Sequence, residues 1–164
     1  MQELYREGVI KAIGVSNFQP DRVMDFLMHQ EIAPAVNQVE THPFHQRVET
    51  QRFLQENKIQ IESWGPFAEG KNNIFHNEVF SSIAKKHEKT IAQVIVRWLT
   101  QREIVVIPKS VRKERMAENS DVFNFKLDPQ DMKAIKSLDS GASLFFDHRD
   151  PAMVKSLSQA VRRT

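Results

Sequence analysis

A cluster of basic residues near the end of the chain carries groups that bind phosphate. Lys109 and Ser110 closely follow a short apolar run, and Arg115 lies in the next segment, where the pattern predicts a helix. A cation, a hydroxyl and the free N–H groups of a helix start can hold a phosphate through charge-assisted hydrogen bonds. Basic clusters are also common on solvated surfaces, so the charges alone are also consistent with an ordinary surface that binds no ligand. Their position after the last of several strands favours the phosphate site more than charge does.

Polar and aromatic side chains follow three earlier apolar runs. Trp64 ends one run, where its indole could stack on a flat ring or pack into the core. Ser16, Asn17 and Gln38 end two others, and their short donors and acceptors could hold an amide group. Capping of the following helices is the more common role for Ser and Asn at such positions.

Histidines occur at two further places. His42 and His45, with Glu40, have a spacing that invites a metal interpretation. Pro43 lies between them and disfavours the helix that would place both rings on one face, so a turn without metal is expected. Residues 148–150, His-Arg-Asp, follow two phenylalanines and could form a substrate lip or ordinary surface; the sequence does not decide.

Composition excludes several classes of protein. The 164 residues predict one domain over 1–164, and 23 Lys+Arg against 21 Asp+Glu give a net charge of only +2, which argues against a nucleic-acid partner. The absence of Cys excludes disulfides and thiolate zinc sites. No apolar stretch is long enough to span a membrane, and the N-terminus has no apolar signal core. We therefore expect a cytoplasmic protein without a membrane partner.

Strands and helices alternate along the chain. Short apolar runs, rich in β-branched residues, predict buried parallel strands at Ala12–Val15, Ala35–Val39, Ile59–Ser63 and Ile104–Ile107. Helical spacing predicts helices over 21–29, 48–57, 79–87, 90–101 and about 112–120, with further helices opened by Pro129 and Pro151. Thr90 and Asp128 are expected N-caps.

This order predicts an α/β fold with a parallel sheet, of which two kinds fit. One is a doubly wound sheet, and the other is half of an eight-stranded (β/α)8 barrel. The unusual polar residues lie where strands pass into helices, as in barrel enzymes. The Gly-x-Gly-x-x-Gly turn of the doubly wound dinucleotide fold is missing. We therefore predict the C-terminal half of a TIM barrel, four parallel strands with surrounding helices.

Together these segments resemble the second half of an aldo-keto reductase. The match lies in five ordered motifs: GVIKAIGVSNF at 8–18, NQVETHP at 37–43, SWGPF at 63–67, Ala92-Gln93 with Arg97-Trp98, and IPKS at 107–110 followed by Arg115, Glu118 and Asn119. Tryptophan at position 64 is similar to the bacterial 2,5-diketo-D-gluconate reductase-like branch. The resemblance covers nearly the whole chain.

The resemblance implies a barrel that binds NADP(H) in an extended form. Ser16, Asn17 and Gln38 would hold the carboxamide, and Trp64 would stack on the nicotinamide. The segment Gly65, Pro66 and Phe67 would run beside the pyrophosphate. The resemblance assigns the adenosine end to Lys109, Ser110, Val111 and Arg115 at the 2′-phosphate, with Glu118 and Asn119 at the adenine.

The resemblance also implies what this chain lacks. Family members transfer hydride with an Asp, Tyr, Lys and His from the first half of the barrel, and this sequence starts after that half. Its single tyrosine, Tyr5, matches no catalytic motif, so no catalytic residue is assigned. No metal ligand is assigned either, since a turn is expected at His42 and His45. We expect a fragment of an NADPH-dependent aldehyde or ketone reductase whose partners are a small carbonyl substrate and the missing half-barrel. The alternative is an inactive nucleotide-binding module, or a half-barrel that pairs with itself.

Overall fold

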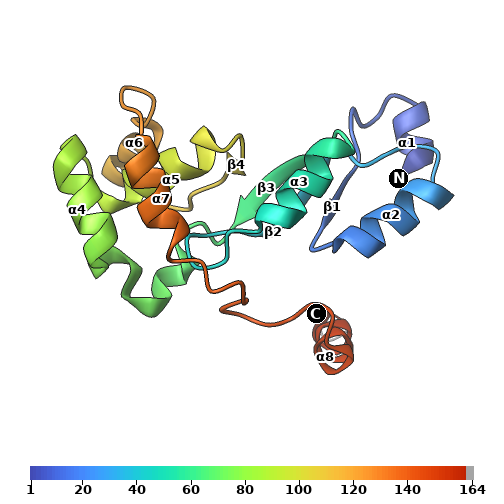
Figure 1. The fold of residues 1–164 in the computed structure, drawn as a ribbon. Coiled ribbons are helices and arrows are strands. Elements are labelled where there is room, and N and C mark those ends of the chain that lie inside the picture. Colours follow the sequence, from blue (N-terminus) through green and yellow to red (C-terminus); the bar gives the residue numbers. More distant parts are fainter. Residues whose placement is uncertain (162–164) are drawn as a thin grey trace.

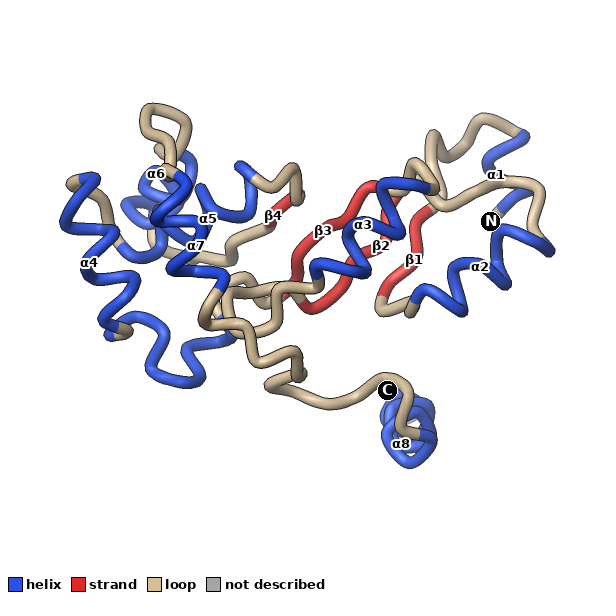
Figure 2. The backbone as a smooth tube through the Cα atoms, in the orientation of Figure 1, coloured by secondary structure: helices blue, strands red, loops and turns tan. Residues whose placement is uncertain are grey.

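The computed structural model describes residues 1–161, and a four-stranded parallel sheet lies at its centre (Figures 1 and 2). The strands are β1 (Gly14–Ser16), β2 (Val36–Glu40), β3 (Gln60–Trp64) and β4 (Val105–Val106). Their order in the sheet is β1-β2-β3-β4. A doubly wound sheet would reverse its strand order at a switch point, and this sheet does not. The predicted parallel strands are confirmed, with bounds shifted by one or two residues.

The two faces of the sheet differ in character. Asn37, Val39, Ile61 and Ser63 lie on one face and are almost completely buried. On the other face the register aligns Ser16, Gln38 and Glu62, none of which is fully buried. Parallel sheets usually carry apolar residues on both faces, but these positions on the open face are polar. Strand pleating alternates the two sets, so the open face carries the polar residues.

Helices follow the strands as the periodicity predicts. The confirmed helices are α2 (Pro20–His29), α3 (Val48–Glu56), α4 (Glu78–His87), α5 (Ile91–Gln101), α6 (Lys113–Ser120), α7 (Pro129–Lys136) and α8 (Pro151–Val161). Two further elements, α1 (Gln2–Arg6) and the 3₁₀ segment η1 (Ala68–His76), were not expected. Figure 1 shows α4 to α7 gathered at the β4 end of the sheet, α1 and α2 at the β1 end, and α8 apart from both groups.

Helix α5 carries the largest part of the core. Val94, Ile95, Trp98 and Leu99 form one buried stripe along it, which matches the spacing of an amphipathic helix. Thr90 accepts from the N–H of Gln93 while the Gln93 side chain accepts from the N–H of Thr90. This capping box confirms the expected N-cap, and Asp128 forms another at the start of α7.

Close contact between β1 and β2 depends on a glycine. A Cβ atom at Gly14 would lie 2.6 Å from Cγ1 of Val36, its partner in the register. Such a distance is shorter than van der Waals contact, so only glycine lets the strands approach this closely.

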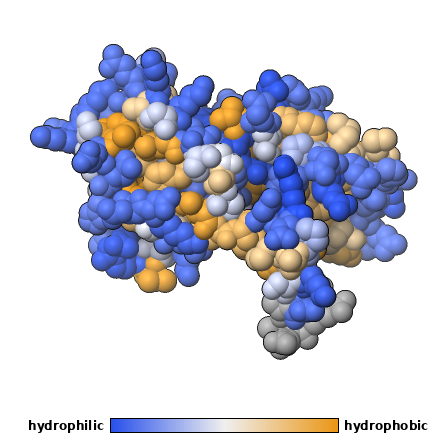
Figure 3. All heavy atoms as spheres, turned by 60° about the horizontal axis from the view of Figure 1, so that its bottom comes forward, coloured by the Kyte–Doolittle hydropathy of each residue, from blue (hydrophilic) through white to orange (hydrophobic). Residues whose placement is uncertain are grey.

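The surface is mixed in polarity. In Figure 3 hydrophobic residues form several patches between hydrophilic ones. No helix within residues 1–161 has the length and apolar character needed to cross a membrane.

Candidate functional site

The polar residues predicted at the strand ends come together at the carboxyl edge of the sheet. The backbone N–H of Asn17 and the hydroxyl of Ser16 both donate to the carbonyl oxygen of Gln38, at 2.8 and 3.1 Å. The indole Nε1 of Trp64 donates to Oδ1 of Asn17 at 2.7 Å. Three neighbouring strand ends are thus tied together, and the residue at position 17 takes a left-handed conformation with φ of 60°.

These residues are not helix caps. The N-cap of α2 is Gln19 and that of α3 is Arg47, and neither makes a side-chain capping bond. The capping interpretation of Ser16 and Asn17 is therefore wrong. The amide of Gln38 instead donates to Oε1 of Glu62 on the open face, at 2.5 Å.

Trp64 is half-buried and packs against the C-terminal segment. Its ring centroid lies 5.1 Å from that of Phe145, with 57° between the planes. Nζ of Lys71 lies 3.8 Å from the centre of the Phe145 ring and donates to the carbonyl oxygen of Leu144 at 2.8 Å. No local sequence pattern indicates this contact, because residues 64 and 145 are far apart along the chain.

The segment after β3 turns sharply at Gly65. Gly65 has φ of +62°, and its carbonyl oxygen accepts from the N–H of Ala68 at 2.8 Å. Pro66 lies inside this turn. The ring of Phe67 lies 5.6 Å from that of Phe75, and both rings face the basic cluster described next.

The predicted phosphate-binding residues line one cavity of about 410 Å³. Its walls include Lys109, Ser110, Arg115, Glu118 and Asn119, together with Arg112, Phe67, Phe75, Thr90, Ile91 and Ala92. Val111 does not line it and is 89% exposed. The carboxylate of Glu118 accepts a hydrogen bond from the hydroxyl of Thr90. The cavity is therefore lined by three cationic side chains, Lys109, Arg112 and Arg115, and by this one carboxylate. The structure brings this group together, with Val111 outside it.

A buried carboxylate joins β2 to the C-terminal segment. Oε1 of Glu40 accepts from Nε2 of His42 at 2.9 Å and from the N–H of Leu144 at 3.0 Å, and Oε2 accepts from the Ser143 hydroxyl at 2.6 Å. Burial by itself would raise the pKa of Glu40, but these hydrogen bonds outweigh it and lower the pKa to about 2. Glu40 thus stays ionised and fixes the segment that reaches Trp64.

His42 and His45 form the expected turn. Each backbone N–H donates to the other's carbonyl oxygen, at 3.2 and 2.9 Å. Within the described part of the chain no three His, Cys, Asp or Glu residues are grouped so as to hold a metal ion.

Tyr5 lies in α1, which borders a cavity with Ile13 and Gly14 at the start of β1. This is the opposite end of the strand from Asn17 and Trp64. The structure therefore does not bring Tyr5 to the candidate site.

Comparisons with known proteins define the class. The description "Aldo/keto reductase family" matches residues 1–140, and the chain belongs to this family. It is 44% identical over 138 residues to glyoxal reductase of Bacillus subtilis (strain 168). These aligned residues make up 84% of this chain and 49% of the relative. It is 42% identical over 144 residues to methylglyoxal reductase DkgA of Escherichia coli (strain K12), with 88% and 52% covered. The chain thus spans about half the length of these relatives.

Solved structures agree with the fold. MGS-M4, an aldo-keto reductase enzyme from a Medee basin deep-sea metagenome library, superposes with a TM-score of 0.88 at 45% identity, over 91% of this chain and 55% of that one. A mutant of Gox0644 in complex with NADPH superposes with a TM-score of 0.84 at 40% identity, over 88% and 53%. The four parallel strands and their helices therefore correspond to part of an aldo-keto reductase barrel.

Proposed function

We propose that this chain forms the NADP(H)-binding part of a carbonyl reductase. The observation that carries the proposal is the presence of two separate sites along one edge of the sheet. The first is the Asn17–Gln38–Trp64 cluster, and the second is the basic cavity. Residues 65–67 lead from the first to the second, because Phe67 follows the β3 turn and lines the cavity. An extended dinucleotide needs such a pair of separated ends.

The first cluster fits a nicotinamide ring and its carboxamide. Asn17, Gln38 and Ser16 supply amide and hydroxyl groups that can exchange their present partners for a carboxamide. Trp64 is covered by Phe145 without being fully buried, which leaves part of its indole for stacking. When bound, NADPH supplies the hydride for an aldehyde or ketone.

The basic cavity fits the 2′-phosphate of NADPH. Lys109 and Arg115 offer cationic donors, and the hydroxyl of Ser110 adds another. A charge-assisted hydrogen bond contributes roughly 1.5–3 kcal/mol. The ribose hydroxyl of NADH gains no comparable term, so the cavity favours NADPH. We assign Glu118 and Asn119, which line the same cavity, to the adenine.

The cofactor proposal is tested by titrating the chain with NADPH and NADH while Trp64 fluorescence is followed. We expect NADPH to bind more tightly, and Arg115→Ala to weaken NADPH by about tenfold or more with little change for NADH. Arg22→Ala, at an exposed position on α2, is the matched control. Trp64→Phe identifies the signal, because the other tryptophan, Trp98, is buried in the core. Equal affinities for the two cofactors would remove the 2′-phosphate assignment.

We propose further that the chain alone does not reduce carbonyl compounds. Protonation of the developing alkoxide needs a positioned acid, which is worth about 10²–10⁴-fold in rate. Tyr5 is at the wrong end of β1 for that role. The check is NADPH oxidation with methylglyoxal by the isolated chain and by the chain mixed with the first half of a full-length relative. Turnover near the common enzymatic range of ~1–10³ s⁻¹ by the chain alone would contradict this. NADPH binding without turnover both by the isolated chain and by the mixture would favour the inactive-module alternative.

A further inference from the structure

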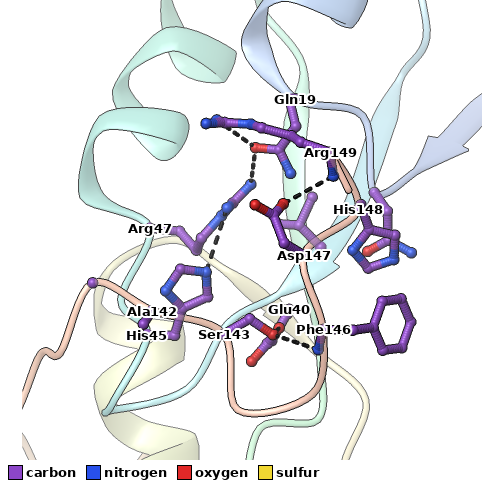
Figure 4. A pocket seen from close by; sticks show the side chains of 13 residues that line it. Gln19, Glu40, His45, Arg47, Ala142, Ser143, Phe146, Asp147, His148 and Arg149 are labelled. Atoms are coloured by element: carbon purple, nitrogen blue, oxygen red, sulfur yellow. Dashed lines mark hydrogen bonds between the residues drawn. The ribbon is translucent and has the colours of Figure 1, made fainter. Parts of the chain in front are cut away.

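A second cavity, of about 430 Å³, lies beside the Asn17 end of the candidate site (Figure 4). It is enclosed by the loops that follow β1 and β2 and by the C-terminal segment. Gln19, Arg47, His148 and Arg149 line it, and so does Asn17. None of these residues except Asn17 belongs to the proposed cofactor site.

Two arginines in this cavity share one neutral acceptor. Nη2 of Arg47 and Nη2 of Arg149 donate to the same Oε1 atom of Gln19, at 3.0 and 3.1 Å. Within residues 1–161 neither guanidinium lies at ion-pair distance from a carboxylate. Two like charges are thus held together by one amide oxygen, which cannot balance them.

Arg47 has further unmet hydrogen-bonding capacity. Its Nε is buried without a partner, and burial, followed by the charge of Arg149, lowers its pKa. Arg47 is also the N-cap of α3, so the positive end of that helix dipole lies at the same place. Each of these features favours an added negative charge.

Two carboxylates, Glu40 and Asp147, also line the cavity and attract the charge of Arg47, but neither forms an ion pair with Arg47 or Arg149 within residues 1–161. Glu40 accepts the three hydrogen bonds described above. Asp147 accepts the backbone N–H of Arg149 at 2.9 Å. The His45 ring lies beside Arg47, with its Nε2 3.4 Å from Nη1, and its Nδ1 is buried without a partner. Around Oε1 of Gln19, therefore, two cationic donors meet a single neutral acceptor.

We propose that this cavity binds a carboxylate or phosphate group of a small molecule, with Arg47 and Arg149 as its two ligands. An oxyanion between the guanidinium groups would take the place of Gln19 Oε1 and pair with both forks. Because Asn17 also borders the nicotinamide end, the bound group belongs to the carbonyl substrate. This last step rests on the proposed function.

Calorimetric titration of the full chain without NADPH tests the site. Succinate and inorganic phosphate are the probes, and succinamide, which has the shape of succinate without its charge, is the control ligand. We expect the oxyanions to bind and succinamide not to bind. Arg149→Gln removes one exposed ligand and should weaken binding by about tenfold or more. Arg52→Gln, on the exposed face of α3, should leave it unchanged.

A second variant gives an independent readout. Gln19→Glu places a carboxylate where the two arginines converge, so it should raise the thermal midpoint and abolish oxyanion binding. Oxyanion binding that is unaltered in both Arg149→Gln and Gln19→Glu, or equal binding of succinamide, would overturn the proposal. Phosphate binding lost in Arg115→Ala and kept in Arg149→Gln would place phosphate in the other cavity and overturn the proposal for phosphate. Failure here is distinct from failure of the NADPH titration, since no cofactor is present.

Discussion

At the scale of single residues, Glu40 has a structural role although it lies outside the candidate cofactor cluster. It is the last residue of β2 and is almost completely buried. Its carboxylate accepts hydrogen bonds from Ser143 and Leu144, which are about a hundred residues further along the chain. Those residues lead directly to Phe145, which covers Trp64. The ionised carboxylate therefore holds the aromatic contact at the site in place, although it belongs to neither end of the proposed dinucleotide site.

Replacing Glu40 by Gln should destabilise the chain in a pH-dependent way. The pKa of Glu40 is about 2 against an ordinary 4.5, which corresponds to a contribution on the order of 3 kcal/mol. A depressed carboxylate pKa stabilises the fold above the unfolded pKa, and this stability is lost as the pH falls from about 4.5 toward 2. We expect Glu40→Gln to be less stable than the wild type at pH 7 and to approach it near pH 2. Chemical denaturation across this range measures the difference.

The control for this experiment is Glu49→Gln, which changes an exposed carboxylate on α3. It should leave stability at pH 7 almost unchanged. If the difference in unfolding free energy between the wild type and Glu40→Gln stays constant from pH 4.5 to pH 2, the three hydrogen bonds do not hold the carboxylate ionised.

At the scale of elements, the contact of β1 with β2 depends on Gly14. Gly14→Ala places a methyl group 2.6 Å from Cγ1 of Val36, and overpacking of this kind costs typically about 1–3 kcal/mol. The added Val36→Ala change removes that Cγ1 atom. The double variant should therefore lose less stability than the sum of the two single changes, which a double-mutant cycle by thermal unfolding measures. Strictly additive effects would mean that the strands are not in close contact at this point.

The elements were predictable from the sequence where a local signal sets them. The stripe on α5 and the caps Thr90 and Asp128 are such signals, and these helices begin where expected. The segment η1 was missed because Glu69, Asn72 and Asn73 adopt left-handed conformations, which side-chain periodicity does not encode. Short α1 is set by no strong amphipathic pattern.

The candidate site was predictable in the same uneven way. The motifs at the strand ends gave Asn17, Gln38, Trp64 and the basic cavity, because parallel strands bring their carboxyl ends to one edge. The covering of Trp64 by Phe145 and the meeting of Arg47 with Arg149 were not predictable. Both join loops that are distant in sequence, and no local pattern fixes how those loops fold over the sheet.

At the scale of the whole molecule, both edge strands lack an outer neighbour within the described residues. Cavities border each edge: one includes Ile13, Val15 and Phe26 beside β1, and the other includes Val105 and Phe123 beside β4. Unpaired strand edges next to apolar surface favour association with another chain. The polar open face of the sheet does not add to this tendency.

We therefore expect the isolated chain to self-associate or to fold poorly at micromolar concentration. Sedimentation velocity over a concentration series measures the association, and thermal unfolding measures the cooperativity. The first half of a full-length relative, added in excess, should reduce self-association if it covers the same edges. A stable monomer with a single cooperative transition would contradict the expectation.

The strand order also has a consequence for how the chain acquires its fold. Because β1, β2, β3 and β4 lie in the sheet in the order in which they occur along the chain, each strand pairs with the one made just before it. No strand has to wait for a distant segment to leave the ribosome. Assembly can therefore proceed strand by strand as synthesis advances, with each strand and its helix adding to the strand made before it.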